Sequence, residues 1–298
     1  MTEQRLAAPG PGRLDVVLTE ALGVPRADVQ RAIEAGRVRV EGRPRPKSFR
    51  LEGGEQLAID LEAARELPAE GDPVPVRYRD EHLYVVSKPP GVPTHPTASR
   101  RSGTLVNRLK AMGVPLAAGW EPDRPGIVHR LDAGTSGLMV VAADDRTHEL
   151  LAAMFKEHTV DRRYMALVRG RVEHDRFAVD AALERQGARV RVTAEGGREA
   201  ETRFEVRERL PRTTLLEAAP RTGRTHQIRV HLSAIGHPVM GDRRYGGAGD
   251  EAKALGLDRT FLHSWRISFE HPVTGRLIEL EEPLPDDLER ALQRARRR

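Results

Sequence analysis

The segment from Glu62 to Pro75 places the strongest limit on how this chain can fold. It contains acidic residues and three prolines, and its apolar residues show no periodic spacing. Such a segment suits neither the interior of a helix nor that of a strand, so we interpret residues 62–75 as a linker. The chain of 298 residues then consists of a short unit, residues 13–61, and a long unit, residues 76–298.

The short unit has the pattern of two helices followed by two strands. Apolar residues recur at helical spacing from Leu14 to Leu22, and a second helical stretch runs from Arg26 to Ala35. Strand-like pieces follow at Val38–Val40 and Leu57–Ile59. We interpret the residues before the first helix, up to Arg13, as a loose start. We therefore expect a small α/β domain.

Basic residues are concentrated on the second helix of the short unit and just after it. They include Arg26, Arg31, Arg37 and Arg39, followed by Arg43, Arg45, Lys47 and Arg50. Cations on one face of a small domain can track a phosphate backbone. A solvated charged surface explains the same pattern, and the charges alone do not separate the two interpretations.

Composition excludes several classes of function. The chain has no cysteine, so disulfides, thiolate metal sites and thiol nucleophiles are excluded. The first thirteen residues lack the apolar core of a signal peptide, and no apolar run approaches membrane-spanning length. We therefore expect a cytoplasmic protein. The net charge of only +5 allows a nucleic-acid partner without requiring one.

The long unit alternates short β-like runs with Gly and Pro turns. Two helical segments stand out, Arg146–Lys156 and Thr225–Ile235. The β-like runs are Leu83–Val86, Leu138–Ala142, Tyr164–Val168, Phe204–Val206, Thr214–Glu217 and Ile267–Phe269.

Asp132 is the candidate reactive carboxylate. It lies in the segment HRLDAGTSG, residues 129–137, a polar loop directly before an apolar strand. Loops held by a buried strand commonly present reactive groups. Alternatively, the Asp132 carboxylate could accept backbone N–H groups in a turn, and the residues alone favour this alternative.

Two further segments carry candidate residues. Tyr164 lies in a half-buried strand, where its ring is either ordinary core or a stacking surface for a base. In RTGRTHQIRVHL, residues 221–232, basic side chains lie just before a helix and in its first turn. The N-terminal end of a helix usually favours acidic residues, so this arrangement opposes the helix dipole. A bound phosphate would resolve that conflict, and a solvated face is the alternative. The histidines show no metal-ligand spacing, so we expect no metal.

These segments together resemble the RluA-type pseudouridine synthases. HRLDAGTSGL is similar to the family signature, and TGRTHQIRVHL, DRRYMALV and KPPGVPTHP match other family motifs. The resemblance runs from Val76 to the C-terminus. It implies an α+β fold with a mixed, largely antiparallel sheet and a central cleft. It also implies the isomerisation of uridine to pseudouridine in RNA without a cofactor.

The short unit resembles the RNA-binding domain named after the fourth protein of the small ribosomal subunit. RLDVVL, VQRAIEAGRVRVEGR and LEGGEQLAI carry this resemblance. Modules of this type recognise the shape of structured RNA. The layout of both units is similar to the RluC/RluD-like branch, which acts on large-subunit ribosomal RNA.

The family resemblance also implies roles for individual residues. Asp132 corresponds to the catalytic aspartate, acting as a nucleophile or as a base. Arg130 corresponds to an arginine that displaces the target nucleotide, and Tyr164 to a tyrosine that lies against the base. Arg229 corresponds to an arginine that forms an ion pair with the catalytic aspartate and keeps it ionised.

The remaining candidates are supporting residues. Ile228 and Leu232 are expected to wall the uracil pocket, and Arg221 and Arg224 to contact RNA phosphate. Lys88, in KPPGVPTHP, is expected to have a structural role.

Two other readings remain open: the same chemistry on transfer RNA, and a catalytically silent RNA-binding or ribosome-assembly protein. A base methyltransferase would need a glycine-rich cofactor loop after a strand, and the sequence has no convincing one. We expect a monomer.

Overall fold

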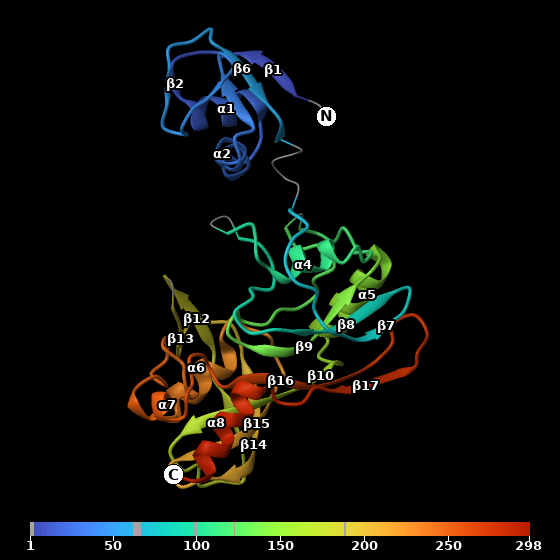
Figure 1. Ribbon diagram of the computed structural model, residues 1–298, viewed down its shortest axis with the longest axis vertical. Helices are drawn as coiled ribbons and strands as arrows, with labels where there is room; N and C mark the ends of the chain where they lie inside the picture. Colours follow the sequence, from blue (N-terminus) through green and yellow to red (C-terminus); the bar gives the residue numbers. More distant parts are fainter. Residues whose placement is uncertain (1–2, 62–66, 98–99, 122, 188) are drawn as a thin grey trace. The chain divides into compact units, whose positions relative to one another are not determined.

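The computed structural model divides the chain into two units. Residues 1–68 and 96–102 form the first, and residues 69–95 and 103–298 form the second (Figure 1). The structure describes residues 3–61, 67–97, 100–121, 123–187 and 189–298. Of the predicted linker, residues 62–66 lie outside the described part, and residues 69–75 belong to the second unit.

The described part of the first unit consists of two helices and a small sheet. α1 (Leu14–Leu22) and α2 (Arg26–Glu34) form where the apolar spacing predicted helices, and they pack against each other. Side chains from both helices and from the sheet share one buried core that includes Leu14, Val29 and Leu57. In the sheet, the described strands are ordered β1 (Gln4–Ala7), β6 (Gln56–Ile59), β3 (Val38–Val40) and β4 (Arg43–Pro44), and β2 (Gly12–Arg13) pairs separately with β5 (Arg50–Leu51).

The expected loose start was wrong for residues 4–7. β1 pairs with β6 along its whole length, with Gln4 opposite Ile59 and Ala7 opposite Gln56. Leu6 packs against the core of the unit. The segment QRLA has one large apolar side chain, Leu6, and no β-branched residue, so long-range pairing defines this strand where local pattern could not.

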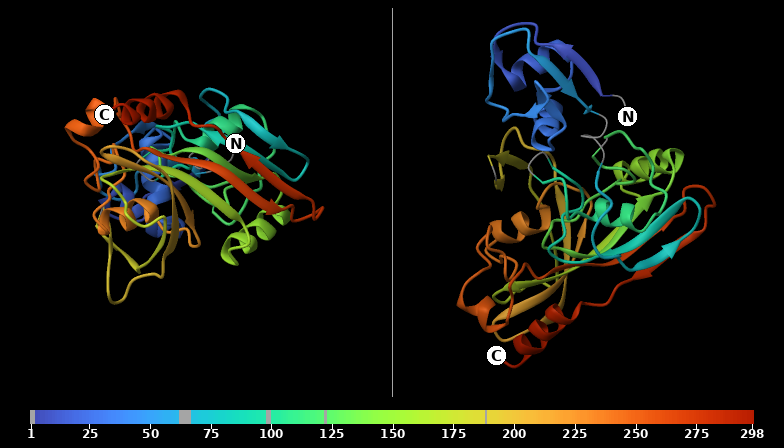
Figure 2. Two further views of the ribbon diagram at one scale, coloured as in Figure 1. Left: turned by 90° about the horizontal axis from the view of Figure 1, so that it is seen from below. Right: turned by 45° about the horizontal axis from the view of Figure 1, so that its top comes forward.

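In the second unit, nine strands of the described residues form one twisted sheet, which can be followed in both views of Figure 2. Most neighbouring strands are antiparallel, as expected. Along the sheet lie β11 (Arg176–Asp180), β14 (Glu201–Arg209), β15 (Thr213–Pro220), β10 (Asp161–Arg169), β16 (Leu262–Glu270), β9 (Ser136–Ala142), β8 (Leu83–Lys88) and β7 (Val76–Arg79), with β17 (Leu277–Glu281) paired to β16.

The pairing of β9 with β16 is parallel, and it sets where the loop before β9 is placed. Gly137 lies opposite Ser264, with a φ of +110°. A Cβ atom on Gly137 would come within 2.1 Å of the Ser264 carbonyl oxygen, so only glycine allows this approach. The loop that carries Asp132 therefore ends at a fixed point in the middle of the sheet.

The helices of the second unit lie beside this sheet. α5 (Asp145–Lys156) packs against β9, and α6 (Gln227–Ala234) packs against β14, β15 and the hairpin strand β13. α6 begins two residues later than predicted, because His226 adopts a left-handed conformation with a φ of +57°. The other described elements are α4 (Leu105–Ala111), α7 (Asp250–Ala254), α8 (Asp286–Arg296), β12 (Leu183–Gln186) and β13 (Arg189–Val192).

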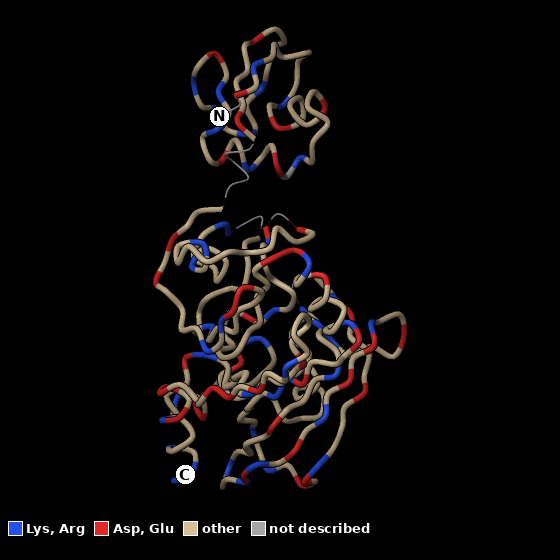
Figure 3. The backbone as a smooth tube through the Cα atoms, turned by 90° about the vertical axis from the view of Figure 1, so that its right-hand side faces the viewer, with Lys and Arg blue, Asp and Glu red and all other residues tan. Residues whose placement is uncertain are grey.

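Charge is mixed along both units. Figure 3 shows Lys and Arg interspersed with Asp and Glu throughout the described trace. This pattern fits the small net charge of +5. Recognition of an anionic partner must therefore depend on where particular arginines are placed, rather than on a uniform positive field. None of the described helices has the length and apolar character needed to cross a lipid bilayer.

Candidate active site

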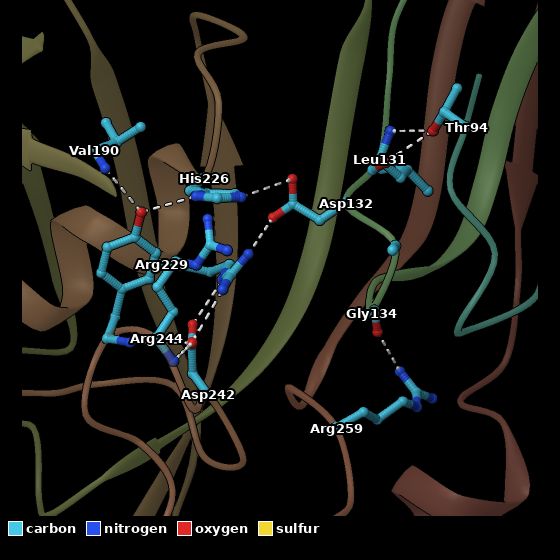
Figure 4. Close-up of polar contacts among 12 residues, drawn as sticks. Thr94, Leu131, Asp132, Gly134, Val190, His226, Arg229, Asp242, Arg244 and Arg259 are labelled. Carbon is cyan, nitrogen blue, oxygen red and sulfur yellow. Dashed lines mark hydrogen bonds and ion pairs between the residues drawn. The ribbon is translucent and has the colours of Figure 1, made fainter. Parts of the chain in front are cut away.

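The backbone around Asp132 is fixed on both sides by the segment that follows β8. The Thr94 hydroxyl donates to the Leu131 carbonyl at 2.8 Å and accepts from the Leu131 N–H at 3.2 Å (Figure 4). On the other side, the Gly91 N–H donates to the Ala133 carbonyl at 2.8 Å. The carboxylate of Asp132 thus extends from a loop whose neighbouring residues are both tied down.

Lys88 strengthens the same connection. Its side chain is fully buried, and its Nζ donates to the carbonyls of Pro89 at 2.9 Å, Val92 at 2.7 Å and Ala133 at 3.3 Å. Burial lowers the pKa of Lys88 to about 7, while the charge of Asp132 acts in the opposite direction. Three carbonyl acceptors favour the ammonium form, which can donate to all of them. This contact pattern is the structural role that was expected for Lys88.

The Asp132 carboxylate faces two side chains of the segment RTGRTHQIRVHL. Arg229 Nη1 lies 2.7 Å from Asp132 Oδ2, and His226 Nε2 lies 3.8 Å from Asp132 Oδ1. The expected ion pair between Asp132 and Arg229 is therefore present. Within the described part of the chain, no backbone N–H donates to this carboxylate. The interpretation favoured by the residues alone, in which this carboxylate accepts backbone N–H groups, is consequently wrong. Asp132 does begin a turn, but it does so through its carbonyl oxygen, which accepts from the Thr135 N–H at 3.0 Å.

Arg229 is held by a second carboxylate, which sequence analysis missed. Its Nε and Nη2 donate to Asp242 Oδ2 and Oδ1 at 2.6 and 3.0 Å, in a bidentate pair. Burial alone would lower the pKa of Arg229, but the hydrogen bonds and charges of Asp242 and Asp132 raise it. Asp242 is fully buried and fixes the guanidinium so that Nη1 faces Asp132 (Figure 4).

His226 is oriented by Tyr245. The Tyr245 hydroxyl accepts from the Val190 N–H at 3.2 Å and lies 2.8 Å from His226 Nδ1. Since a phenol has one hydrogen, we assign that hydrogen to the bond with Nδ1, which leaves the Nε2–H of neutral His226 facing Asp132. Burial lowers the pKa of His226, against the opposing charge of Asp132, so the neutral ring is favoured.

A cavity of about 890 Å³ opens beside Asp132. Six of the predicted site residues line it: Arg130, Asp132, Tyr164, Arg224, Ile228 and Arg229. Tyr164 is only 6% exposed, and burial raises the pKa of its hydroxyl, so the phenol stays protonated. Arg130 is exposed at the cavity. These six residues supply the cavity with one carboxylate, one aromatic side chain and three arginines, a set suited to a nucleotide.

Two predicted residues lie elsewhere. Leu232 was expected to wall the pocket, but it does not line the cavity and is fully buried, because it lies one turn further along α6 than Ile228. Arg221 also lies outside the cavity lining. It is exposed, and its Nη1 lies 3.4 Å from Glu201 Oε2.

Arg31 and Arg37, the basic residues of the first unit that we expected to bind RNA, differ in availability. Arg37 is exposed. The guanidinium of Arg31 forms an ion pair with Asp28, and only 16% of the Arg31 side chain is accessible. Charge counting along the sequence could not distinguish the two, because it does not show which cations already have a carboxylate.

Comparisons with known proteins agree for both units. A family model described as RNA pseudouridylate synthase matches residues 82–234, and a model of the S4 domain matches residues 12–57. "Ribosomal large subunit pseudouridine synthase D" of Nitrosomonas europaea is 37% identical, with 95% of this chain and 84% of that protein covered. An RNA pseudouridine synthase of Bacillus subtilis, YlyB, is 36% identical, with 91% and 90% covered.

Solved structures show the same fold. The structure titled "Human RNA Pseudouridylate Synthase Domain Containing 4" is 23% identical, with a TM-score of 0.59, and 74% of this chain and 93% of that chain are covered. The structure titled "Human RNA Pseudouridylate Synthase Domain Containing 1" is 26% identical, with a TM-score of 0.58, and 73% of this chain and 86% of that chain are covered.

Proposed function

We propose that this chain, which belongs to the RNA pseudouridylate synthase family and carries an S4 domain, isomerises uridine to pseudouridine in large-subunit ribosomal RNA. Family membership makes the chain an RNA pseudouridine synthase, which is an isomerase. The S4 domain implies RNA binding. The ribosomal substrate is the proposed step. Relatives named for the large ribosomal subunit, at 36 to 37% identity, support it.

Asp132 carries the proposal for the reaction. Its carboxylate lines the cavity beside the guanidinium of Arg229, which is itself fixed by Asp242. Pseudouridine formation breaks the C1′–N1 bond, turns the uracil and forms a C1′–C5 bond. C5 loses a proton, N1 gains one, and no redox cofactor is required. A positioned carboxylate can add to the sugar or base as a nucleophile, or take a sugar proton as a base.

The other cavity residues support binding of an everted nucleotide. We assign the ring of Tyr164 to contact with the uracil, and Ile228 to the pocket wall. We assign Arg130, which is exposed at the cavity, to the space left by the displaced nucleotide. Arg224 in the cavity and Arg221 outside it are assigned to RNA phosphates, as is the exposed Arg37 of the S4 domain.

The reaction is tested with ribosomal RNA transcribed in vitro, which lacks pseudouridine. Purified wild-type protein is expected to introduce carbodiimide-dependent reverse-transcription stops in the large-subunit RNA. Asp132→Asn is expected to lower the rate by about 10³-fold or more, because the substitution removes the anionic carboxylate. RNA affinity and the melting temperature are measured on both proteins, and both are expected to be similar.

Each alternative has its own outcome when transfer RNA transcribed in vitro is assayed beside the ribosomal RNA. Stops in transfer RNA and none in ribosomal RNA would overturn the substrate and keep the chemistry. Binding to both RNAs without product would make the chain a silent RNA-binding protein. Equal rates for wild type and Asp132→Asn would remove Asp132 from the reaction.

A further inference from the structure

Arg162 is a cavity residue to which the proposed mechanism assigns no role. It lies on β10, two residues before Tyr164, and both side chains line the cavity. Only 7% of Arg162 is exposed. The position is therefore inside the nucleotide cavity rather than on the outer surface, where a solvated arginine would need no explanation.

Arg162 lacks the counter-ion that a buried guanidinium normally has. In the described part of the chain, no carboxylate lies within ion-pair distance of it. Its hydrogen bond to the Pro220 carbonyl is long, at 3.4 Å, and its buried Nε has no acceptor. The Phe155 ring, with its centroid 5.3 Å from the guanidinium carbon, supplies a cation–π contact.

The neighbouring arginines show how unusual this is. Arg163, the next residue, lies 2.8 Å from Asp161 and 3.4 Å from Glu217. Arg229, in the same cavity, contacts two carboxylates. Burying a cation without an anion is strongly unfavourable, so such a site points to an anion that arrives from outside.

The surroundings of Arg162 fit a phosphate group. Gly223 forms the adjacent wall, since a Cβ atom there would lie 3.5 Å from Arg162 Nη1. The aromatic rings near Arg162, those of Phe155 and Tyr164, carry no negative charge. Arg162 and Tyr164 are alternate residues of β10 that both line the cavity, with a shift in the pairing to β16 between Arg163 and Tyr164. A uracil against Tyr164 would thus place its phosphodiester near Arg162.

We propose that Arg162 binds a backbone phosphate of the RNA at the uridine held in the cavity, so that the counter-ion of this buried guanidinium is supplied by the substrate. The proposal rests on the proposed function, because it assumes that RNA enters this cavity. A guanidinium that stays uncompensated until phosphate binds makes the contact selective for nucleotides inside a polynucleotide over free uridine.

The salt dependence of RNA binding tests the proposal without requiring any reaction. We expect Arg162→Met to weaken binding to a large-subunit RNA fragment and to reduce the slope of log K against log salt by about 0.7 to 0.9, one phosphate contact. Arg163→Met, which removes a cation that already has carboxylates, is the matched control and should leave the slope unchanged. Arg162→Lys, which keeps the positive charge, should retain most of the wild-type slope.

Chemical replacement of single phosphates locates the contact. In a short RNA around the modified uridine, each linkage is replaced in turn by an uncharged methylphosphonate. Wild type is expected to lose about 10-fold in kcat/KM at one linkage next to that uridine. Arg162→Met is expected to show no further loss at that linkage.

The outcomes are separable from those for the proposed function. A slope equal to that of wild type in Arg162→Met and Arg162→Gln would overturn the phosphate contact, even if pseudouridine forms. A melting temperature that falls while slope and linkage dependence stay unchanged would make Arg162 purely structural. A reduced slope without any product would keep the contact and reject the reaction.

Discussion

At the scale of single residues, the site depends on one guanidinium that lies between two carboxylates. The Asp242 carboxylate accepts hydrogen bonds from two nitrogens of Arg229, and the third nitrogen donates to Asp132. The Asp242 carboxylate is 1% exposed and that of Asp132 is 16% exposed. Asp242 is therefore the anchor, and Asp132 is the carboxylate left accessible to a substrate.

This arrangement predicts the effect of Asp242→Asn. Loss of the buried charge should destabilise the protein by about 3 kcal/mol and let the guanidinium reorient. We expect kcat to fall by about 10- to 100-fold with little change in KM, because Arg229 acts on the carboxylate and not on RNA affinity. Urea denaturation and single-turnover kinetics measure the two effects.

Glu282→Gln is the control for Asp242→Asn. Glu282 accepts a bidentate pair from Arg77, outside the cavity lining. Its substitution should lower stability and leave kcat unchanged. If both variants reduced kcat in proportion to their loss of stability, Asp242 would have no specific role in positioning.

At the scale of elements, the parallel pair β9 and β16 holds the loop of Asp132 in place. We predict that Gly137→Ala separates these strands, because its Cβ would meet the Ser264 carbonyl at 2.1 Å. A loss of several kcal/mol, on the order of 4, is expected, together with loss of activity. Thermal unfolding and pseudouridine formation are the measurements.

The Gly236→Ala variant is a control that distinguishes the steric clash at Gly137 from the strain of a left-handed backbone. Gly236 also has a positive φ, +86°, but a Cβ there meets nothing within 4 Å. This variant should cost only about 1 kcal/mol. Similar losses in the two variants would show that left-handed backbone strain, and not the close strand approach, explains the effect at Gly137.

At the scale of the whole molecule, two histidines with lowered pKa values make stability depend on pH. Burial lowers the pKa of His129 to about 3 and that of His95 to about 4, and nearby arginines add to both shifts. Unfolded histidines titrate near 6.5. Between pH 6.5 and the folded pKa values the unfolded chain binds more protons, so stability is full above pH 6.5 and falls as the pH drops.

The expected slope is up to about 1.4 kcal/mol per pH unit for each such histidine. Urea denaturation between pH 7.5 and 5, above the range where carboxylates titrate, measures it. His129→Gln keeps an acceptor for the Val140 N–H and should reduce the slope. His174→Gln, at an exposed position, should not. A flat stability profile in wild type would contradict the prediction.

The sequence alone determined the features that depend on local pattern. Apolar spacing located α1, α2 and α5 to within one residue at most of their ends. The motif around Asp132 and the segment RTGRTHQIRVHL together identified five residues of the cavity, and DRRYMALV identified a sixth, Tyr164, because each motif keeps reactive side chains at short, fixed spacing. The mixed, largely antiparallel sheet also followed from the resemblance that these motifs carry.

The tertiary structure decided which distant side chains meet. Asp132 and Arg229 are 97 residues apart in the sequence. No local pattern shows that Asp242 anchors Arg229. Leu232 and Ile228 look equivalent on one helix, yet only Ile228 lines the cavity. Arg162 and Arg163 are adjacent cations, and packing leaves Arg162 without a carboxylate partner among the residues that the structure describes. Periodicity reports how each element is buried, whereas ion pairing depends on distances in space that long-range packing alone sets.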